Sequence, residues 1–345
     1  MKILLIGNFA PPFEEENLHN LSFLKKLEDE GHECSVINNS SNPSMDKRFV
    51  DTKNYIDFVL KLLRLCRGKD VVHFHTKGYL RLGLLKLMTS ILVGKIFRAK
   101  AFITIHSELF SIQGQMRSPV GGRQTLFTAF TFADRIICSD RDTYNVASMY
   151  MRKSNFELIP SFIYIPDEIK APGTPLLKKL KDKKKVIVFL NVKYPSFLFE
   201  ILREMASTYP LPSEVGLVIS FSEKPSSKFQ HVLEEAGKEM LEHLIFVEQD
   251  DLKTTLAAYD RANIIMRPLS CDGTTFFESF SISVKKTMHA GDNIYSPSGL
   301  IFVKEGETAE MCACIINTML CLENGALPEL KMEDSFSRIK KLYGS

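Results

Sequence analysis

The chain lacks the features that mark several specialised classes of protein. Its 345 residues contain no apolar run of about 18 residues, so we expect no transmembrane helix. The apolar start at residues 1–7 is short and no cleavage site follows it, so we expect no signal peptide. The net charge is only +3, which is too small to indicate a nucleic-acid-binding protein. The composition, 45% hydrophobic and 25% charged, is ordinary for a globular protein, and the length suffices for two domains.

Cysteine is present but lacks the spacing of a metal site. The seven cysteines are scattered, and the close pair Cys312 and Cys314 has no second pair to complete a zinc site. Free, mostly buried thiols in a reducing compartment are the simplest interpretation. We therefore expect a cytoplasmic protein.

Strand-length apolar runs alternate with helix-length amphipathic segments along the whole chain. The predicted strands lie at 2–6, 34–37, 71–75, 101–105, 135–138, 186–190, 214–219 and 244–247, with helices at 17–29 and 55–66 among them. Such alternation favours an α/β fold with parallel, doubly wound sheets. A proline-containing segment from Pro160 to Lys185, ending in a basic run that we expect to be solvated, separates two halves. We predict one domain over residues 1–165, a second over 183–330, and a terminal helix within 331–345.

The stretch 259–307 has the most informative order of segments. An apolar strand at 263–266 is expected to end at Pro268, because proline has no amide to donate to a sheet. A turn-forming segment with Asp272 and Gly273 follows, and we predict a second helix from about Glu278 and a strand from Val284. Loops at the carboxyl ends of strands bind ligands in open α/β sheets, and amides at the start of a helix hold phosphate. A plain strand-loop-helix unit with a solvated acid is the alternative interpretation.

This order resembles the nucleotide-sugar site of retaining glycosyltransferases of family 4. The segment 278–285, ESFSISVK, is similar to the family's Glu-Ala-Leu-Ser-Leu-Gly-Val-Pro, and 299–307 is similar to the strand and turn that follow it. The first half continues the resemblance, in matching order, at Gly7–Phe13, Gly31–Glu33, Asp70–Thr76, Ile103–Ser107, Ala133–Ser139 and Leu158–Ser161. No single match is specific, but their order is, and the matches extend from residue 3 to about residue 307.

The resemblance implies a fold and an activity. The fold would be two Rossmann-like domains facing across a cleft, the GT-B architecture, with the terminal helix crossing back to the first domain. The activity would be transfer of a sugar from a UDP- or GDP-sugar to a glycan or lipid-linked acceptor with retention, in surface polysaccharide synthesis. The nucleotide sugar would be a substrate, and no cofactor or metal would be needed.

The resemblance also suggests roles for individual residues. We expect His106 and Asp272 to be catalytic, and Asn8, Glu15 and His75 to lie on the acceptor side. The expected donor-binding residues are Lys193, Arg267, Ser270, Gly273, Thr274, Thr275 and Glu278. A hydrogen-bonded loop histidine is the alternative interpretation of His106.

The donor-site motif is degraded, which leaves two other functions open. Glu14, Glu15 and Glu16 replace the family's paired glycines, and Val192 and Phe197 stand where two cations are usual. One alternative is therefore a non-catalytic relative that binds a sugar nucleotide or serves as partner subunit of another transferase. The other is a sugar-nucleotide epimerase, which would release free sugar and UDP from a UDP-sugar alone.

Two further segments carry open interpretations. His73 and His75 point the same way on one strand, but the sequence shows no additional ligand, so we expect no metal there. The segment 77–100 has an apolar side surrounded by basic residues. The apolar side consists of Leu80, Leu84, Leu87, Met88 and Ile91. The basic residues are Arg81, Lys86, Lys95, Arg98 and Lys100. This pattern suits an interfacial helix on the cytoplasmic face of a membrane, with an ordinary core helix as the alternative.

Overall fold

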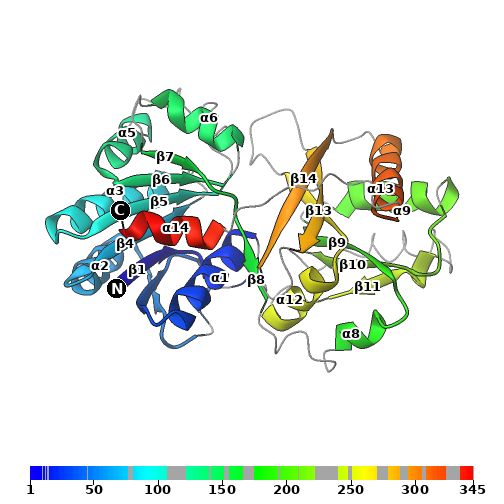
Figure 1. Ribbon diagram of the computed structural model, residues 1–345, viewed down its shortest axis with the longest axis horizontal. Coiled ribbons are helices and arrows are strands. Elements are labelled where there is room, and N and C mark those ends of the chain that lie inside the picture. The colour runs from blue at the N-terminus through cyan, green and yellow to red at the C-terminus, as the bar shows by residue number, and fades with distance from the viewer. Residues whose placement is uncertain are drawn as a thin grey trace.

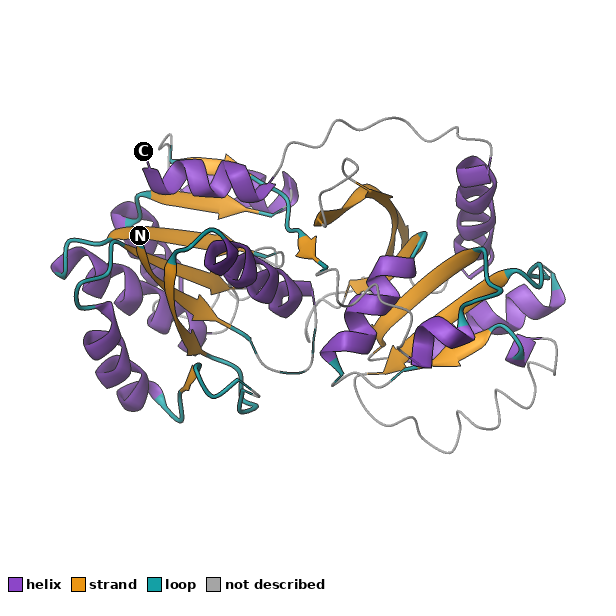
Figure 2. Ribbon diagram, turned by 60° about the horizontal axis from the view of Figure 1, so that its bottom comes forward, coloured by secondary structure: helices purple, strands orange, loops and turns teal. Residues whose placement is uncertain are grey.

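The computed structural model contains two α/β lobes, each built around its own sheet (Figure 1). The structure describes residues 1–9, 11, 13, 15–44, 46–76, 81–106, 122–139, 141–150, 155–165, 175–192, 195–208, 210–221, 240–247, 251–269, 279–287, 294–304, 308–323 and 335–344. Both chain ends lie in the first lobe (Figure 2).

The first sheet is parallel throughout. Its strands are β1 (Lys2–Gly7), β2 (Glu33–Asn38), β3 (Val50–Asp51), β4 (Val71–Thr76), β5 (Lys100–Ile105), β6 (Arg135–Cys138) and β7 (Phe156–Leu158). Its helices are α1 (Glu15–Asp29), α2 (Tyr55–Cys66), α3 (Arg81–Ile96), α5 (Gly122–Phe132) and α6 (Arg141–Tyr150). The strand order β3-β2-β1-β4-β5-β6-β7 reverses direction between β1 and β4. Every described pairing in this sheet is parallel, as the alternating sequence pattern predicts.

Alternate residues of these strands enter two different cores, because successive side chains of a strand point to opposite faces. Leu4 and Ile6 pack with residues of α2, α3 and α5, whereas Ile3 and Leu5 pack with residues of α1 and of the terminal helix α14 (Ser335–Gly344). Figure 1 shows α1 and α14 in front of the sheet and α2 and α3 behind it. Helices therefore cover both faces of the first sheet, α1 and α14 on one face and α2, α3 and α5 on the other.

The helix α3 covers most of the segment 77–100, for which the sequence left an interfacial and a core helix open. Leu84, Leu87 and Ile91 are buried in the core beneath the sheet, so this apolar side faces protein and is not available to a bilayer. Leu80 lies outside the described residues. The core-helix interpretation of 77–100 is thus the one that the packing of α3 supports. Within the described part of the chain, no helix has the length and apolarity needed to cross a membrane.

The second sheet is mixed. Its strands are β8 (Ile163–Tyr164), β9 (Lys185–Val192), β10 (Val215–Phe221), β11 (Leu244–Phe246), β12 (Ile264–Leu269), β13 (Ser279–Thr287) and β14 (Ile294–Lys304). Its helices are α8 (Pro175–Lys179), α9 (Pro195–Ser207), α12 (Leu252–Arg261) and α13 (Thr308–Glu323). The order is β11-β10-β9-β12-β13-β14-β8, with parallel pairing from β11 to β12 and antiparallel pairing from β12 to β8.

Two expectations for the segment after residue 263 are wrong. No helix opens after Glu278, because residues 279–287 form β13 and pair antiparallel with β12. The run Ser279 to Thr287 alternates serine with apolar or β-branched residues over much of its length, which suits a strand better than a helix. Pro268 lies inside β12 and does not end it. The pairing of β12 with β9 stops at Met266, so Pro268 has a sheet neighbour on the β13 side only, where a missing amide is tolerated.

The chain end and α1 connect the two parts of the described structure. The terminal helix α14 packs on the first sheet through Phe336, Ile339 and Tyr343, and Lys100 Nζ donates to the Tyr343 carbonyl over 3.0 Å. Leu18 of α1 belongs to a buried cluster made mostly of second-domain residues. The segment predicted to link the domains contains β8, which pairs with β14 of the second sheet.

Candidate functional site

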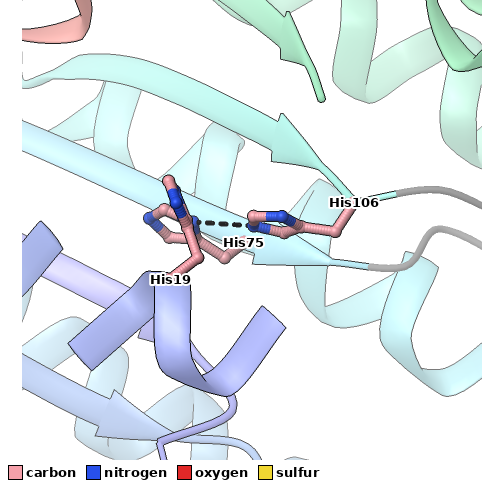
Figure 3. Close-up of side chains that lie close together, drawn as sticks. All are labelled: His19, His75 and His106. Carbon is pink, nitrogen blue, oxygen red and sulfur yellow. Dashed lines mark hydrogen bonds between the residues drawn. The ribbon is translucent and has the colours of Figure 1, made fainter. Parts of the chain in front are cut away.

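Histidines gather at the carboxyl ends of two adjacent strands of the first sheet. His75 lies near the end of β4, beside Thr104 of β5, and His106 directly follows β5. The His106 amide donates to the Thr76 carbonyl over 2.9 Å, which holds the start of the loop against β4. His19 of α1 completes the group from the helix that crosses this end of the sheet (Figure 3). Ligands of open α/β sheets bind at such carboxyl ends.

A chain of hydrogen bonds fixes two of these rings. His75 Nδ1 lies 3.3 Å from His106 Nε2 (Figure 3). His106 Nδ1 lies 3.0 Å from the Ser161 hydroxyl. The His75 and His106 rings are stacked, with centroids 5.6 Å apart. Ser161 belongs to the segment that leads into the second domain, so the chain of bonds reaches from β4 to the inter-domain connection.

His19 is held by the neighbouring peptide. His19 Nδ1 lies 3.1 Å from the Phe162 amide nitrogen and 3.2 Å from the Phe162 carbonyl oxygen. This nitrogen accepts from the amide in one tautomer of the ring and donates to the carbonyl in the other. Among the described residues, His19 Nε2 and His75 Nε2 have no hydrogen-bond partner although both atoms are buried. Unpaired buried nitrogens are unusual in folded proteins and require an explanation.

His73 has a different and structural role. Its two ring nitrogens are hydrogen-bonded to the Tyr343 hydroxyl and, at 2.7 Å, to the Thr104 hydroxyl. Both nitrogens are therefore satisfied by protein, and one of the partners belongs to α14. His73 fastens the terminal helix to the first sheet.

Burial keeps these imidazoles neutral. Burial lowers the pKa of His19 to about 4 and that of His73 to about 3. The pKa of His75 is well below its ordinary value because the ring is buried and because His73, His106 and His19 surround it. At neutral pH each of these rings therefore presents one N–H and one lone pair.

The end of β1 lies against the cluster. A Cβ on Gly7 would meet Asn20 Nδ2 at 2.9 Å and His75 Cβ at 3.0 Å, so only glycine allows this approach. Asn20 Nδ2 donates to the Asn8 carbonyl over 3.1 Å. Asn8 follows β1 and His75 is the penultimate residue of β4. These two strands flank the point where the strand order reverses. Ligands collect at such a switch point.

The other predicted site residues are placed in part or not at all. Glu15 begins α1 and Arg267 lies in β12, but the side chain of neither is described. Lys193, Ser270, Asp272, Gly273, Thr274, Thr275 and Glu278 lie outside the described residues. Along the chain, Lys193 directly follows β9 and Ser270 directly follows β12. These two strands flank the reversal of strand order in the second sheet.

Sequence reasoning missed His19 and Ser161. His19 lies four residues before Phe23 and eight before Leu27, both fully buried, and that helical spacing marked it as a residue on the apolar side of α1. Ser161 carried no comparable signal, because its contact with His106 spans 55 residues of sequence.

Comparison with known proteins supports the fold. No family model matches the chain, and no curated protein matches it in sequence. An alpha-glucosyltransferase in complex with UDP and a 13-mer DNA containing an HMU base is similar over 76% of this chain and 71% of its own, with a TM-score of 0.51 at 9% identity. The S. aureus MnaA–UDP structure covers 76% of this chain and 73% of its own, with a TM-score of 0.48 at 14% identity. Anabaena HepE in complex with UDP covers 77% and 73%, with a TM-score of 0.46 at 14% identity.

The likeness to the alpha-glucosyltransferase agrees with the two sheets described above. In this chain each of the two sheets reverses its strand order and is covered by helices, as in a Rossmann-like domain. The chain therefore has the GT-B fold.

Proposed function

We propose that the chain is a glycosyltransferase that uses a UDP- or GDP-sugar as donor and retains the anomeric configuration of the transferred sugar. The acceptor is a glycan or lipid-linked sugar, and the product belongs to a surface polysaccharide. The GT-B fold supports this proposal, as does the UDP that the similar alpha-glucosyltransferase binds.

One observation carries the proposal further than the fold. Along the chain, Asn8, Lys193 and Ser270 directly follow strands that flank a reversal of strand order, and His75 is the penultimate residue of such a strand. Ligand binding in doubly wound sheets concentrates at these points. This order along the chain is what supports the predicted acceptor and donor residues as parts of one site.

In this proposal His106 acts on the transferred sugar. Its ring is fixed by Ser161 and His75, so it is oriented before a ligand arrives. A preoriented group that strengthens its contact as charge develops lowers the barrier of the chemical step. For a sugar oxygen to bind His106, one of these two protein contacts must be exchanged for it.

A second candidate function is a non-catalytic relative that binds a sugar nucleotide or a partner transferase. The strand β13 favours it, because residues 279–287 form a strand where the related enzymes are expected to begin a donor-binding helix. The amides of that helix start would otherwise hold a phosphate.

Turnover with nucleotide sugars separates these functions. The full chain is incubated with UDP- and GDP-sugars, with and without lipid-linked and glycan acceptors, and the nucleoside diphosphate and sugar products are identified. Acceptor-dependent release of diphosphate with a retained linkage supports the transferase. Release of UDP and a free sugar with one ring carbon inverted, from a UDP-sugar alone, indicates an epimerase, and donor binding with no product indicates the non-catalytic relative.

The variant His106→Ala tests the role of the histidine. Loss of one such contact removes on the order of 2.7–4 kcal/mol of transition-state stabilisation, which lowers turnover by roughly two to three orders of magnitude. Donor affinity, measured by the rise in melting temperature, should change little. The matched control is His73→Gln, which alters a neighbouring ring that is bound by protein alone. Turnover of His106→Ala within about threefold of the wild type would contradict the role.

A further inference from the structure

We propose a binding site for one divalent first-row transition metal ion, such as Zn²⁺, formed by His19, His75 and His106. The three rings come from α1, β4 and the end of β5, and one ligand nitrogen from each lies within 4.8 Å of the others (Figure 3). The site goes beyond the proposed transfer reaction, because metal binding can be measured with no nucleotide sugar present. It revises the expectation that the chain binds no metal.

The distances between the nitrogens suit a metal centre. Zinc binds imidazole nitrogen at about 2.0–2.1 Å, so two nitrogens of a tetrahedral site are separated by about 3.3–3.4 Å. His75 Nδ1 and His106 Nε2 are 3.3 Å apart, which already equals that separation. The nitrogen of His19 needs an approach on the order of 1.5 Å at most, which a rotation of the ring can supply.

One nitrogen of the cluster has the character of a metal ligand. His19 Nε2 is buried with no hydrogen-bond partner among the described residues, and the His19 residue is only 1% exposed. A metal ion is one explanation for a buried, unpaired polar atom.

Contacts behind two of the rings resemble those that orient metal-bound histidines. Such a histidine donates its other ring N–H to a carbonyl or hydroxyl oxygen, which fixes the tautomer. His106 Nδ1 is 3.0 Å from the Ser161 hydroxyl, and His19 Nδ1 is 3.2 Å from the Phe162 carbonyl. In the tautomer that donates to these oxygens, Nε2 of both rings presents its lone pair to the cluster.

His73 is a buried histidine next to the cluster that does not belong to it, and it serves as a comparison. Its ring stacks on His75 with centroids 4.2 Å apart, yet both of its nitrogens are bound by hydroxyl groups. A purely structural histidine in this core therefore obtains two protein partners, whereas His19 Nε2 has no partner among the described residues. This difference distinguishes His19 from a histidine that only packs.

The test is a metal titration of the full chain. The protein is stripped with a chelator, desalted, and titrated with Zn²⁺ in competition with a chromophoric chelator, and with Co²⁺ as a spectroscopic probe. We expect one ion per chain, a rise in melting temperature with Zn²⁺, and Co²⁺ spectra of a low-coordinate site with nitrogen ligands and no thiolate band. Less than about one-tenth equivalent bound at a tenfold excess of Zn²⁺ would overturn the proposal.

Variants locate the site. His19→Gln and His75→Gln should each weaken Zn²⁺ binding by at least about tenfold, because each removes a ligand. The controls are His73→Gln, which disturbs the same core without removing a ligand, and His32→Gln, which lies outside the cluster. Equal loss in His73→Gln and His19→Gln would assign the effect to packing and overturn the site. If a variant does not fold, the Co²⁺ spectrum of the wild type decides, since a thiolate band would place the metal at a cysteine.

Discussion

The two faces of the first sheet are packed by different chemistry. The face toward α2, α3 and α5 is filled by aliphatic and aromatic side chains, such as Phe58 and Leu62. The face toward α1 and α14 also buries His19, His73 and His75, and α14 is held to β4 and β5 by hydrogen bonds of Tyr343. The same strands supply both faces, since their side chains alternate.

The difference shows where stability and function lie in this domain. Apolar contacts of the first face are favourable without any partner geometry. Buried imidazoles are favourable only when their nitrogens are paired, and two of them are not paired within the described residues. A ligand can bind where a core retains unpaired polar atoms. On this face those atoms lie near the carboxyl ends of β4 and β5.

The largest effect is expected on the apolar face. Phe58→Ala removes a fully buried ring from α2 and should lower the free energy of unfolding by about 3–5 kcal/mol, because it leaves a cavity. Metal and donor binding by the folded variant should be unchanged. Chemical denaturation measures the loss, and Leu60→Ala, at a 63% exposed position of the same helix, should change stability little. Similar losses in both variants would show that the face is not a packed core.

Acidification should act on the imidazole face. The pKa of His19 is near 4 in the folded protein against 6.5 in its ordinary state, so the unfolded chain binds more protons between these values. Stability is fully present above about pH 6.5 and falls as the pH drops toward 4, with His19 contributing on the order of 3 kcal/mol. Denaturation of the chelated protein across this range measures the slope. The variant His19→Gln should have a shallower slope, and an unchanged slope would contradict the assignment.

A smaller effect should follow from freeing the terminal helix. Tyr343→Phe leaves a nitrogen of His73 without its hydroxyl partner, and the loss of one partner of a buried hydrogen bond costs about 1–3 kcal/mol. Hydrogen exchange of the amides in α14 should increase together with the loss of stability. If exchange in α14 is unchanged while stability falls, the hydroxyl stabilises the sheet without holding the helix.

The smallest effect concerns an exposed contact of the same helix. Lys340 Nζ lies 2.9 Å from a carboxylate oxygen of Glu30, and the Lys340 side chain is 38% exposed. Exposed ion pairs contribute about 0–1 kcal/mol, so Lys340→Ala should weaken the attachment of α14 far less than Tyr343→Phe. Comparison of the two variants by denaturation ranks the contacts, and the reverse ranking would show that charge rather than the buried hydrogen bond holds the helix.

Much of the first domain could be predicted from the sequence. The predicted segments 55–66 and 135–138 coincide with α2 and β6, because apolar periodicity reflects which side of an element is buried. His75 and His106 were identifiable because polar residues at strand ends stand out against apolar runs. The position of His19 beside His75 and His106 could not be predicted, because it depends on how α1 packs across the sheet.

The second domain was harder to predict for a physical reason. The run after Glu278 contains alternating serines and apolar residues, and its resemblance to a helix start outweighed that period of two. The antiparallel partner that favours a strand there, β14, lies farther along the chain and is not visible in the local pattern. Strand pairing is decided by such distant contacts.

Donor binding is the most direct test of the central claim, that this GT-B chain uses a nucleotide sugar. Calorimetric titration of the stripped full chain with a panel of UDP- and GDP-sugars, without added metal, measures it independently of the histidine cluster. We predict saturable binding of at least one donor, one per chain, with competition by the matching free nucleoside diphosphate. Absence of binding by every donor at millimolar concentration, with protein shown to be folded, would contradict the claim.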